Sequence, residues 1–301
     1  MREFDVLILG GGPAGLSAAI YAGRGNRSVA VIDSATIGGQ PQYYSSIANY
    51  PGYVSIDSSG LVRNMAFQAE SYNVEFFPYT EIERVHFLAG NDKEIVTDEE
   101  VFKGHVVIIA TGAHPKLLNV PEEEKFRFNG ISYCAICDGG FYKGKDVVVI
   151  GGGNSALEEA LYLSKIAHKV YVIHRRDEFR ADKVIQSHVY ETMNIEVILN
   201  STVKHLLGEN KVTGVLLSDG RELKVDGVFP YIGQIPNSEL FDGLIKTDKN
   251  GFIVTSAIQE TNLEGVYAAG DVTASLLKQV VTATAEGAIA GTFALRYLDV
   301  K

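Results

Sequence analysis

Short apolar runs and helix-forming runs alternate along the chain, with glycine-rich turns between them. Twice, an apolar run is followed by glycines, then by a helix-forming run and a second apolar run. These two successions occupy residues 4–9, 16–22 and 29–32, and residues 146–150, 155–166 and 169–173. Apolar runs of this length next to helical segments are typical of buried strands in parallel sheets. We therefore predict an α/β fold.

The first glycine turn has the GxGxxG spacing of dinucleotide-binding folds. Gly10, Gly12 and Gly15 directly follow the first apolar run. Such glycines permit a tight turn, a close approach of the backbone to a pyrophosphate, and close packing of the helix on the strand. The phosphates then lie at the N-terminus of the helix. Pro13 and Ala14 belong to the same turn, and we include them in the predicted site.

The second succession carries the related GxGxxA spacing in the same context of strand, turn and helix. Its predicted nucleotide-contacting residues are Gly151, Gly153, Asn154, Ser155 and Ala156. The chain is therefore predicted to contain two Rossmann-like dinucleotide-binding domains.

The residues after the second apolar run distinguish the two sites. In the first site this position is Asp33, whose carboxylate can accept a hydrogen bond from a ribose hydroxyl. In the second it is His174, followed by Arg175 and Arg176. A carboxylate would repel a 2′-phosphate, whereas guanidinium groups bind one through paired hydrogen bonds. We predict NADP at the second site, with Arg180 on the same helical face as Arg176; the alternative is a solvated basic helix start.

Two dinucleotides on one chain are most simply FAD and NADPH, because hydride transfer needs a donor and an acceptor. Two further apolar runs, residues 106–112 and 265–271, end in residues small enough for the backbone to lie against a cofactor. We assign these runs and the first glycine turn to FAD. The predicted contacts at the ends of the two runs are Thr111, Gly112, Gly270 and Asp271.

The order of these segments predicts that one domain is inserted into the other. The last FAD segment follows the NADPH fold, so the FAD domain must be discontinuous. We predict an FAD-binding domain over residues 1–113 and 248–301, and an NADPH-binding domain over residues 114–247. The chain should cross between them at residues 113–118 and 242–249, where turn-forming residues are frequent.

Cys134 and Cys137 are the only cysteines of the chain, and they form one CxxC motif. A single CxxC is typical of redox chemistry or of half a metal site. No second cysteine pair or short histidine motif completes a zinc site, so we favour redox chemistry and predict no metal. At a helix start such a pair can close a disulfide and form a reactive thiolate. Asp138 is either an acid–base group for the thiols or a helix cap.

Composition limits the possible partners and locations. The chain has 301 residues and a formal net charge of −10, which argues against a nucleic-acid or anionic-membrane surface. No apolar stretch approaches the roughly 20 residues that a membrane span needs. Residues 1–5 carry charge directly into the first strand, which leaves no room for a secretory apolar region. We expect a cytoplasmic protein.

Four motifs together resemble low-molecular-weight thioredoxin reductase. They are CysAlaIleCysAspGly, GlyGlyGlyAsnSerAla, HisArgArgAspGluPheArgAla and AlaAlaGlyAspVal, and the resemblance extends over essentially the whole chain. It implies noncovalently bound FAD, a homodimer, and a second cysteine nearer the flavin than the first. Further positions that match residues lining the flavin in that family are Gly39, Gln40, Asn49, Lys278 and Gln279.

The chain departs from the family pattern at four places. Ile136 stands where a threonine is common, Gly140 where an aromatic residue is usual, residues 41–44 where a leucine and a run of threonines are common, and Lys278 where an arginine is usual. The first two flank the cysteines that a partner protein must reach. Lys278 keeps a positive charge but loses any bidentate contact.

We predict a thioredoxin reductase in which NADPH reduces the flavin, the flavin reduces the Cys134–Cys137 disulfide, and the dithiol reduces thioredoxin or a thioredoxin-like protein. Because the CxxC and the NADPH site share one domain but serve one flavin, we expect that domain to change position during turnover. The alternatives are an FAD-dependent dithiol oxidase or a ferredoxin-dependent flavin thioredoxin reductase, which lack the basic NADP signature. A flavoprotein that senses the nicotinamide ratio without turnover is a third alternative.

Overall fold

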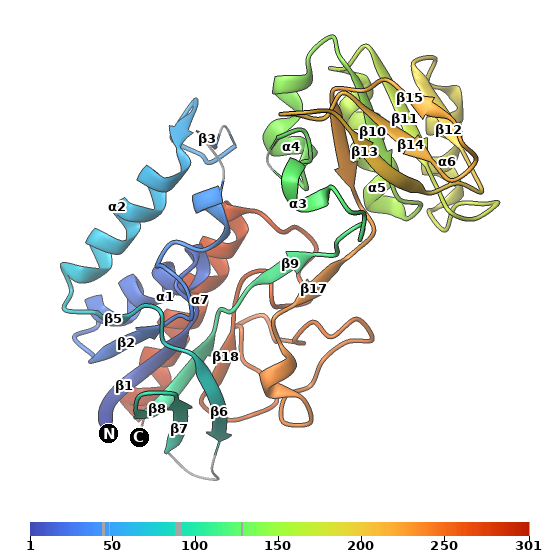
Figure 1. Ribbon diagram of the computed structural model, residues 1–301. Helices are drawn as coiled ribbons and strands as arrows, with labels where there is room; N and C mark the ends of the chain where they lie inside the picture. Colours follow the sequence, from blue (N-terminus) through green and yellow to red (C-terminus); the bar gives the residue numbers. More distant parts are fainter. Residues whose placement is uncertain (44–45, 48, 88–91, 128, 301) are drawn as a thin grey trace. The chain divides into compact units, whose positions relative to one another are not determined.

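The computed structural model describes residues 1–43, 46–47, 49–87, 92–127 and 129–300. The chain forms two compact units (Figure 1). The first unit comprises Met1–His114 and Ile235–Lys301, and the second comprises Pro115–Gln234. Each unit contains a mainly parallel sheet with helices, so the predicted α/β class is confirmed.

The first unit is built on a seven-stranded sheet in the order β5-β2-β1-β8-β7-β6, with β18 added to β8. The strands of this sheet are β1 (Arg2–Leu9), β2 (Val29–Ile32), β5 (Glu75–Phe77), β6 (Ile82–Phe87), β7 (Lys93–Thr97), β8 (Val101–Ile109) and β18 (Val266–Ala268). The unit also contains β3 (Ser46–Ile47) and β4 (Ile56–Asp57), which pair with each other. Its helices are α1 (Pro13–Arg24), α2 (Ser58–Glu70), α7 (Val280–Val300), η1 (Gln40–Tyr43) and η3 (Glu239–Phe241).

The two halves of strand β8 pair with different strands along one edge. Its first half pairs antiparallel with β7, and its second half pairs parallel with β18. Along the other edge, β8 pairs in parallel with β1 over its length. The carboxyl ends of β1, β8 and β18 therefore meet at the same edge of the sheet, where ligands bind in open parallel sheets.

Both faces of this sheet are buried. In β1, Val6 and Ile8 join a core with α1, α2 and α7, while Leu7 and Leu9 point into a second core on the opposite face. The period-two alternation of strand side chains produces this division. A continuous apolar run in the sequence is thus the signature of a strand that is covered on both sides.

Helix α7 packs closely on α1 because glycines remove the side chains between them. A Cβ added at Gly287 would meet the carbonyl oxygen of Ala14 at 2.1 Å. The Ser17 hydroxyl donates to the Thr284 carbonyl over 2.7 Å across the same contact. This packing fixes the N-terminal ends of both helices beside the first glycine turn.

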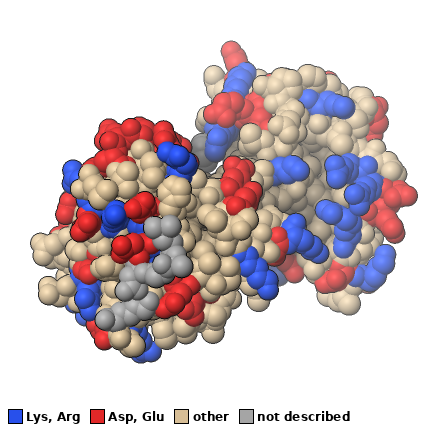
Figure 2. All heavy atoms as spheres, turned by 90° about the horizontal axis from the view of Figure 1, so that it is seen from below, with Lys and Arg blue, Asp and Glu red and all other residues tan. Residues whose placement is uncertain are grey.

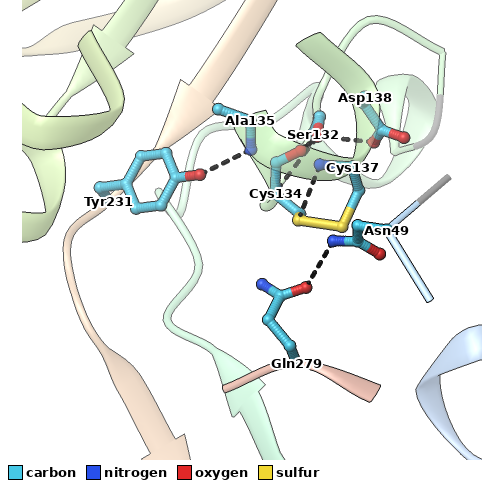
Figure 3. Close-up of a disulfide and its surroundings, with 8 residues drawn as sticks. All are labelled: Asn49, Ser132, Cys134, Ala135, Cys137, Asp138, Tyr231 and Gln279. Atoms are coloured by element: carbon cyan, nitrogen blue, oxygen red, sulfur yellow. Dashed lines mark hydrogen bonds between the residues drawn. A yellow bond between two sulfur atoms is a disulfide. The ribbon is translucent and has the colours of Figure 1, made fainter. Parts of the chain in front are cut away.

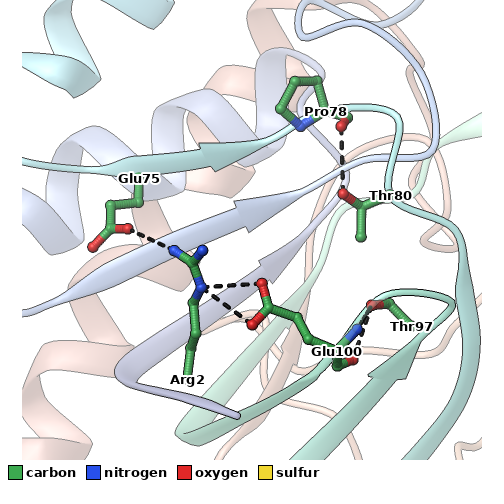
Figure 4. Close-up of polar contacts among 6 residues, drawn as sticks. All are labelled: Arg2, Glu75, Pro78, Thr80, Thr97 and Glu100. Carbon is green, nitrogen blue, oxygen red and sulfur yellow. Dashed lines mark hydrogen bonds and ion pairs between the residues drawn. The ribbon is translucent and has the colours of Figure 1, made fainter.

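A polar cluster joins the strands at the opposite end of the sheet (Figure 4). The Arg2 guanidinium lies 3.0 Å from the Glu100 carboxylate and 3.5 Å from that of Glu75. Glu100 is held in turn by the Thr97 hydroxyl, which accepts from its backbone N–H. These contacts tie β1 to β5 and to the β7–β8 turn, away from the glycine turn at the other end of β1.

The second unit contains a four-stranded parallel sheet in the order β12-β11-β10-β16 and a three-stranded antiparallel sheet β13-β14-β15. Its strands are β10 (Asp146–Ile150), β11 (Lys169–Ile173), β12 (Ile195–Ile198), β13 (Val203–Leu207), β14 (Gly214–Leu217), β15 (Glu222–Leu223) and β16 (Gly227–Pro230). Its helices are α3 (Glu123–Phe126), α4 (Ala135–Asp138), η2 (Gly139–Tyr142), α5 (Asn154–Ser164) and α6 (Lys183–Glu191).

Two short strands, β9 (Ala113–Pro115) and β17 (Gln234–Pro236), carry the chain between the units and pair with each other. The second crossing lies before the predicted segment 242–249. The reason is that Phe241 and Ile245, which follow β17, are buried in the core of the first unit. Turn-forming residues in 242–249 mark a surface loop of that unit instead.

Charge is divided unevenly between the units (Figure 2). Within the ranges of the first unit the sequence has 12 lysines and arginines and 21 aspartates and glutamates. Within the second unit the sequence has 15 lysines and arginines and 16 aspartates and glutamates. The second unit is therefore nearly neutral, and its local basic groups are not outweighed by surrounding acids. In the described part of the chain, no helix is long and apolar enough to cross a membrane.

Candidate functional site

The first glycine turn connects β1 to α1 and is closed to side chains. Gly10 adopts φ +107°, and a Cβ there would meet the Ala110 carbonyl oxygen at 2.3 Å. A Cβ at Gly15 would meet the Gly10 carbonyl oxygen at 1.9 Å. Pro13 is the first residue of α1, where its missing N–H costs nothing. The GxGxxG turn thus has the tight geometry that the sequence predicts.

Gly12 is the glycine of this turn that leaves space. The nearest atom to a Cβ built there is the Gly39 Cα, at 3.8 Å. In the other direction, a Cβ at Gly39, which has φ +64°, would meet the Gly12 Cα at 2.8 Å. The two loops therefore approach each other backbone to backbone and form a cradle, which requires glycine at position 39. Ala14, two residues after Gly12, is buried in the core beneath them.

Asp33 follows β2, as predicted, and one of its oxygens holds the glycine turn. Its Oδ2 accepts from the Gly11 N–H over 2.6 Å, and its Oδ1 accepts from the Ala35 N–H over 2.8 Å. Each carboxylate oxygen has a further lone pair for a ribose hydroxyl. Asp33 thus fixes the turn and offers acceptors beside it.

The ends of β8 and β18 are held by residues that the sequence analysis did not identify. Asn237 accepts from the Thr111 hydroxyl through its carbonyl and donates its amide to the Thr111 carbonyl, both over 2.7 Å. Glu286 of α7 accepts from the Gly270 N–H over 2.7 Å. Asn237 is 126 residues from Thr111 in the sequence, and Glu286 is 16 residues from Gly270. No sequence motif marks either partner. Gly112 is unobstructed, with φ +72°.

Lys278 lies behind the Asp271 turn. Its Nζ donates to the carbonyls of Asp271 and Thr273, each over 2.8 Å, and lies 4.2 Å from the centre of the Phe252 ring. Burial lowers the pKa of Lys278 and raises the pKa of Asp271. Lys278 therefore supports the turn through backbone carbonyls. This is a role for which one ammonium suffices and a bidentate arginine is not needed.

The remaining predicted flavin residues are surface groups. The Asn49 amide donates to the Gln279 side-chain carbonyl over 3.0 Å, joining the loop after β3 to the start of α7 (Figure 3). Gln40, at the beginning of η1, is exposed. The glycine cradle, Asp33 and the ends of β8 and β18 fit a dinucleotide, because each offers backbone or an acceptor with no side chain in the way.

The second glycine turn, between β10 and α5, repeats this design. A Cβ at Gly151 would meet the Tyr231 carbonyl oxygen at 2.4 Å and the Ala156 Cβ at 2.6 Å, so no side chain fits at Gly151. Gly153 has no atom within 4 Å of an added Cβ, and Ser155 is exposed.

Asn154 begins α5 and has a structural partner. Its amide donates to the Asp182 carboxylate, and its carbonyl accepts from the Asp182 N–H, both over 2.8 Å. This reciprocal pair ties the glycine turn to the start of α6.

Three of the four predicted basic residues are exposed, and one is not. Arg175, Arg176 and Arg180 are exposed, and none forms an ion pair with an acid of the described residues. His174 is buried, with 6% of its surface exposed, and packs against Phe179. Burial, with repulsion from Arg180, lowers the pKa of His174. His174 is therefore neutral at pH 7 and adds no charge to the arginine group.

The expectation that Arg180 shares a helical face with Arg176 is wrong. Residues 175–182 are not helical, and α6 begins at Lys183. Phe179 is buried in the core of the second unit and anchors the segment. The Arg180 N–H instead donates to the Gly152 carbonyl over 2.7 Å. The backbone thus places Arg180 directly beside the glycine turn, by a route other than the predicted helix.

Cys134 and Cys137 form a disulfide in the second unit (Figure 3). Cys134 is the N-cap of α4, and its Sγ accepts from the Cys137 N–H over 3.2 Å. Helix α4 has only four residues, so its macrodipole is small. The local N–H groups, more than the dipole, are what can stabilise a thiolate here.

Asp138 lies beside the disulfide as part of a buried polar cluster. Ser132, which is 4% exposed, donates its hydroxyl to Asp138 Oδ2 over 2.7 Å and accepts from the Cys134 N–H over 3.1 Å. Burial raises the pKa of Asp138 above its usual range, and the Ser132 hydrogen bond partly opposes this. Asp138 caps no helix with its side chain. The pKa of Asp138 is thus shifted in the direction that favours a carboxyl group able to take up a proton.

Two tyrosines, neither identified from the sequence, hold the segment on either side of Cys134. The Tyr133 hydroxyl donates to Glu123 over 2.9 Å, and Glu123 accepts from the Leu118 and Asn119 N–H groups. The Tyr231 hydroxyl accepts from the Ala135 N–H over 2.7 Å. No sequence motif marks these pairings. The described residues contain no group of three or more His, Cys, Asp or Glu side chains that could hold a metal ion.

Comparisons with known proteins agree over the whole chain. Residues 4–287 match the model of the pyridine nucleotide-disulphide oxidoreductase family. The thioredoxin reductase of Bacillus subtilis (strain 168) is 41% identical over 305 residues, covering 99% of this chain and 96% of that protein. A "34.2 kDa protein in rubredoxin operon" of Clostridium pasteurianum is 39% identical, covering 100% and 99%. The crystal structure of thioredoxin reductase from Streptococcus pyogenes MGAS5005 is 40% identical, covers 100% of this chain and 99% of that one, and has a TM-score of 0.92.

Proposed function

The chain belongs to the pyridine nucleotide-disulphide oxidoreductase family, and within it to the thioredoxin reductases; from this premise we propose that it is an NADPH-dependent reductase of thioredoxin or a thioredoxin-like protein. Its cofactors are FAD and NADPH. Electrons pass from NADPH through FAD and the Cys134–Cys137 disulfide to the disulfide of the partner protein.

One observation carries this proposal. The second unit holds both a CxxC disulfide and a glycine turn flanked by three exposed arginines without ion-pair partners among the described residues. Unpaired guanidinium groups next to a dinucleotide turn fit a 2′-phosphate, which distinguishes NADPH from NADH. The ferredoxin-dependent and oxidase alternatives give no reason for such a group. A sensor without turnover gives no reason for the disulfide.

We assign the FAD site to the first unit and the NADPH site to the second. In the first unit, Gly10, Gly12 and Gly39 form the cradle, and Asp33 offers acceptors to a ribose. In the second, the turn at Gly151 to Gly153 would receive the pyrophosphate, and Arg175, Arg176 and Arg180 the 2′-phosphate. When bound, the two cofactors supply hydride transfer and a two-electron store.

The cysteine pair and Asp138 carry the exchange with the partner protein. Two electrons and two protons convert the Cys134–Cys137 disulfide to a dithiol. One thiolate then attacks the partner disulfide, a mixed disulfide forms, and the second thiol displaces the reduced partner. With its raised pKa, Asp138 can take up and return the proton that these thiols exchange, and Ser132 orients its carboxylate.

The homodimer and the location are part of the same proposal. The relatives support thioredoxin as the partner, and we propose a homodimer in the cytoplasm, where thioredoxin systems keep thiols reduced. The charge of −10 agrees with a partner that is neither nucleic acid nor an anionic membrane.

Anaerobic titration tests the proposal directly. The yellow protein is titrated with NADPH and, separately, with NADH while flavin absorbance is followed, and thioredoxin is then added. NADPH should bleach the flavin at far lower concentration than NADH, and thioredoxin should restore the colour. Equal bleaching by both nucleotides, or no reoxidation by thioredoxin, would contradict the proposal.

A further inference from the structure

Ser132 lies between the Asp138 side chain and the peptide groups of Cys134. Its hydroxyl oxygen is 2.7 Å from Asp138 Oδ2 and 3.2 Å from the Cys134 carbonyl oxygen, and it accepts from the Cys134 N–H over 3.1 Å. Figure 3 shows the Ser132 side chain directed toward Asp138. Ser132 is 4% exposed, so water has little access to these contacts. One hydroxyl therefore links the Asp138 carboxylate to the peptide groups before and after Cys134.

The Ser132 hydroxyl has one proton to donate and can accept two hydrogen bonds. Its proton has two acceptors within reach, Asp138 Oδ2 and the Cys134 carbonyl oxygen. A carboxylate is the stronger acceptor, and the shorter distance agrees with a bond to Asp138. The Cys134 carbonyl does not depend on this proton, because it also accepts from the Asp138 N–H over 3.0 Å. With Asp138 ionised, the hydroxyl is thus directed to the carboxylate.

Protonation of Asp138 changes which acceptor is favoured. The neutral carboxyl group gains an O–H donor and becomes a weaker acceptor. The Ser132 oxygen can then accept from this O–H and keep the bond from the Cys134 N–H, while its own proton turns to the Cys134 carbonyl. In this state the donor and both acceptor positions of the hydroxyl are used. The contacts of Ser132 therefore fit both protonation states of Asp138, with a different direction of the hydroxyl in each.

We infer that Ser132 is a positioning residue whose hydroxyl stabilises the ionised form of Asp138 and transmits its protonation to the peptide groups of Cys134. The inference deepens the proposed function, on which the role of Asp138 in thiol exchange rests. Asp138 takes up one proton and loses its negative charge, whereas Ser132 turns its own proton and neither gains nor loses one. Burial raises the pKa of Asp138 and the Ser132 hydrogen bond opposes the rise, which agrees with this direction.

The other titratable groups around Asp138 do not replace Ser132. Helix α4 packs against η2 and α5. On η2, burial, aided by the charges of Asp138 and Asp226, raises the pKa of Tyr142 to about 12, so Tyr142 is neutral at pH 7. On α5, neither Glu158 nor Glu159 forms a hydrogen bond with Asp138. Within the described part of the chain, Asp138 has no ion-pair partner. Ser132 is thus the side chain that controls this carboxylate.

The test is the titration of Asp138 in the oxidised holoenzyme, without NADPH or thioredoxin. Aspartate carboxyl carbons are labelled with carbon-13, and the NMR signal of Asp138 is the one missing in Asp138→Asn. Ser132→Ala should raise the proton affinity of Asp138 about tenfold, because a hydrogen bond to the ionised form is lost. Ser201→Ala is the matched control. Ser201 is 2% exposed and lies in the second unit, but its hydroxyl bonds to that of Ser218 and to no acid, so the titration should not change.

The amide NMR signal of Cys134 tests whether the hydroxyl transmits the change. In the wild type and in Ser201→Ala, this signal should move with the same midpoint as Asp138, because the Ser132 oxygen accepts from the Cys134 N–H. In Ser132→Ala it should stay constant over that pH range. An unchanged or lowered proton affinity of Asp138 in Ser132→Ala would overturn the inference. So would a Cys134 signal that follows Asp138 equally in Ser132→Ala and the wild type.

These measurements and the test of the proposed function can fail separately. If the protein failed to reduce thioredoxin with NADPH, the proposed function would fall while the titration of Asp138 could still be measured. If Ser132→Ala left that titration unchanged, the inference would fall while electron transfer through the cysteine pair would still stand.

Discussion

The arginine group of the second unit makes a quantitative prediction about nucleotide choice. Replacing both Arg175 and Arg176 with alanine removes guanidinium groups that are exposed and unpaired among the described residues. The change therefore leaves no acid without its partner, and the fold should keep its stability. The perturbation should act on binding alone.

The expected loss follows from the strength of a charge-assisted contact. A hydrogen bond to a charged group contributes about 1.5–3 kcal/mol, and exposure to solvent favours the lower value. At about 1.4 kcal/mol for each factor of ten, two lost contacts should weaken NADPH binding about 100-fold. NADH lacks the 2′-phosphate, so its affinity should change less than about twofold.

Both affinities are measured by equilibrium binding of NADP⁺ and NAD⁺ to the oxidised enzyme under anaerobic conditions. Binding is followed by quenching of flavin fluorescence and by calorimetry. Arg221→Ala is the matched control, because Arg221 is also a solvent-exposed arginine of the second unit but is paired with Asp219. It should leave NADPH binding unchanged. If the wild type binds both nucleotides equally, or the double variant keeps NADPH affinity within about twofold, the assignment of the arginine group is refuted.

Three further predictions concern single residues. Asp138→Asn should slow thioredoxin reduction about 100-fold or more while NADPH still bleaches the flavin, because proton exchange with the thiols is lost. Stopped-flow experiments measure flavin reduction and thioredoxin reduction separately, and equal slowing of both steps would contradict the role of Asp138. Burial raises the pKa of Glu159 to about 7, aided by Glu158, so the folded state holds this proton more tightly than the unfolded state and stability falls as pH rises from about 4.5 to 7. When the pH rises from 5 to 8, the unfolding free energy of Glu159→Gln should therefore increase by about 1 kcal/mol relative to that of the wild type, a value discounted for partial solvation. Urea unfolding at both pH values measures this difference. No difference would mean that the Glu159 carboxyl is already ionised at pH 5. Gly10→Ala should lower the flavin content and reduce the free energy of unfolding by about 2–4 kcal/mol. Gly220, which has φ +85° but open space around it, is the control: Gly220→Ala should reduce the free energy of unfolding by about 1 kcal/mol and retain the flavin. Similar losses of stability in the two variants would refute the close contact between Gly10 and Ala110.

The sequence predicts best those strands that consist of a continuous run of apolar residues. The ranges 29–32, 146–150 and 169–173 coincide with β2, β10 and β11, because a run of apolar residues between glycine and polar residues has few other structures available. The strand predicted at 265–271 is shorter in the structure, since Gly270 and Asp271 form a turn held by Glu286. That contact joins β18 to α7, and no local pattern reports it.

In the predicted site, too, local features could be predicted from the sequence, whereas contacts made by tertiary packing could not. The glycine turns and the cysteine pair depend on local geometry and could be found from spacing. His174 occupies a position equivalent to Asp33 in the sequence step, but the packing of Gly152 and Phe179 around it makes it a buried neutral residue. Arg180 reaches the glycine turn through its backbone, which periodicity does not predict. Tyr231 holds the disulfide segment through a contact with Ala135, which is 96 residues away in the sequence. Ser132 and Glu123 support the same segment over shorter separations, in pairings that no motif marks. The homodimer and the change of position of the NADPH domain stay predictions.

The most direct test of the central claim is electron flow in Cys137→Ser. The variant is mixed anaerobically with NADPH, and flavin reduction and thioredoxin reduction are followed in the same sample. We expect the flavin to be reduced at close to the wild-type rate while thioredoxin reduction is abolished, because Cys134 alone cannot close a disulfide. Thioredoxin reduction at the wild-type rate would contradict the account, since the CxxC pair would then be structural.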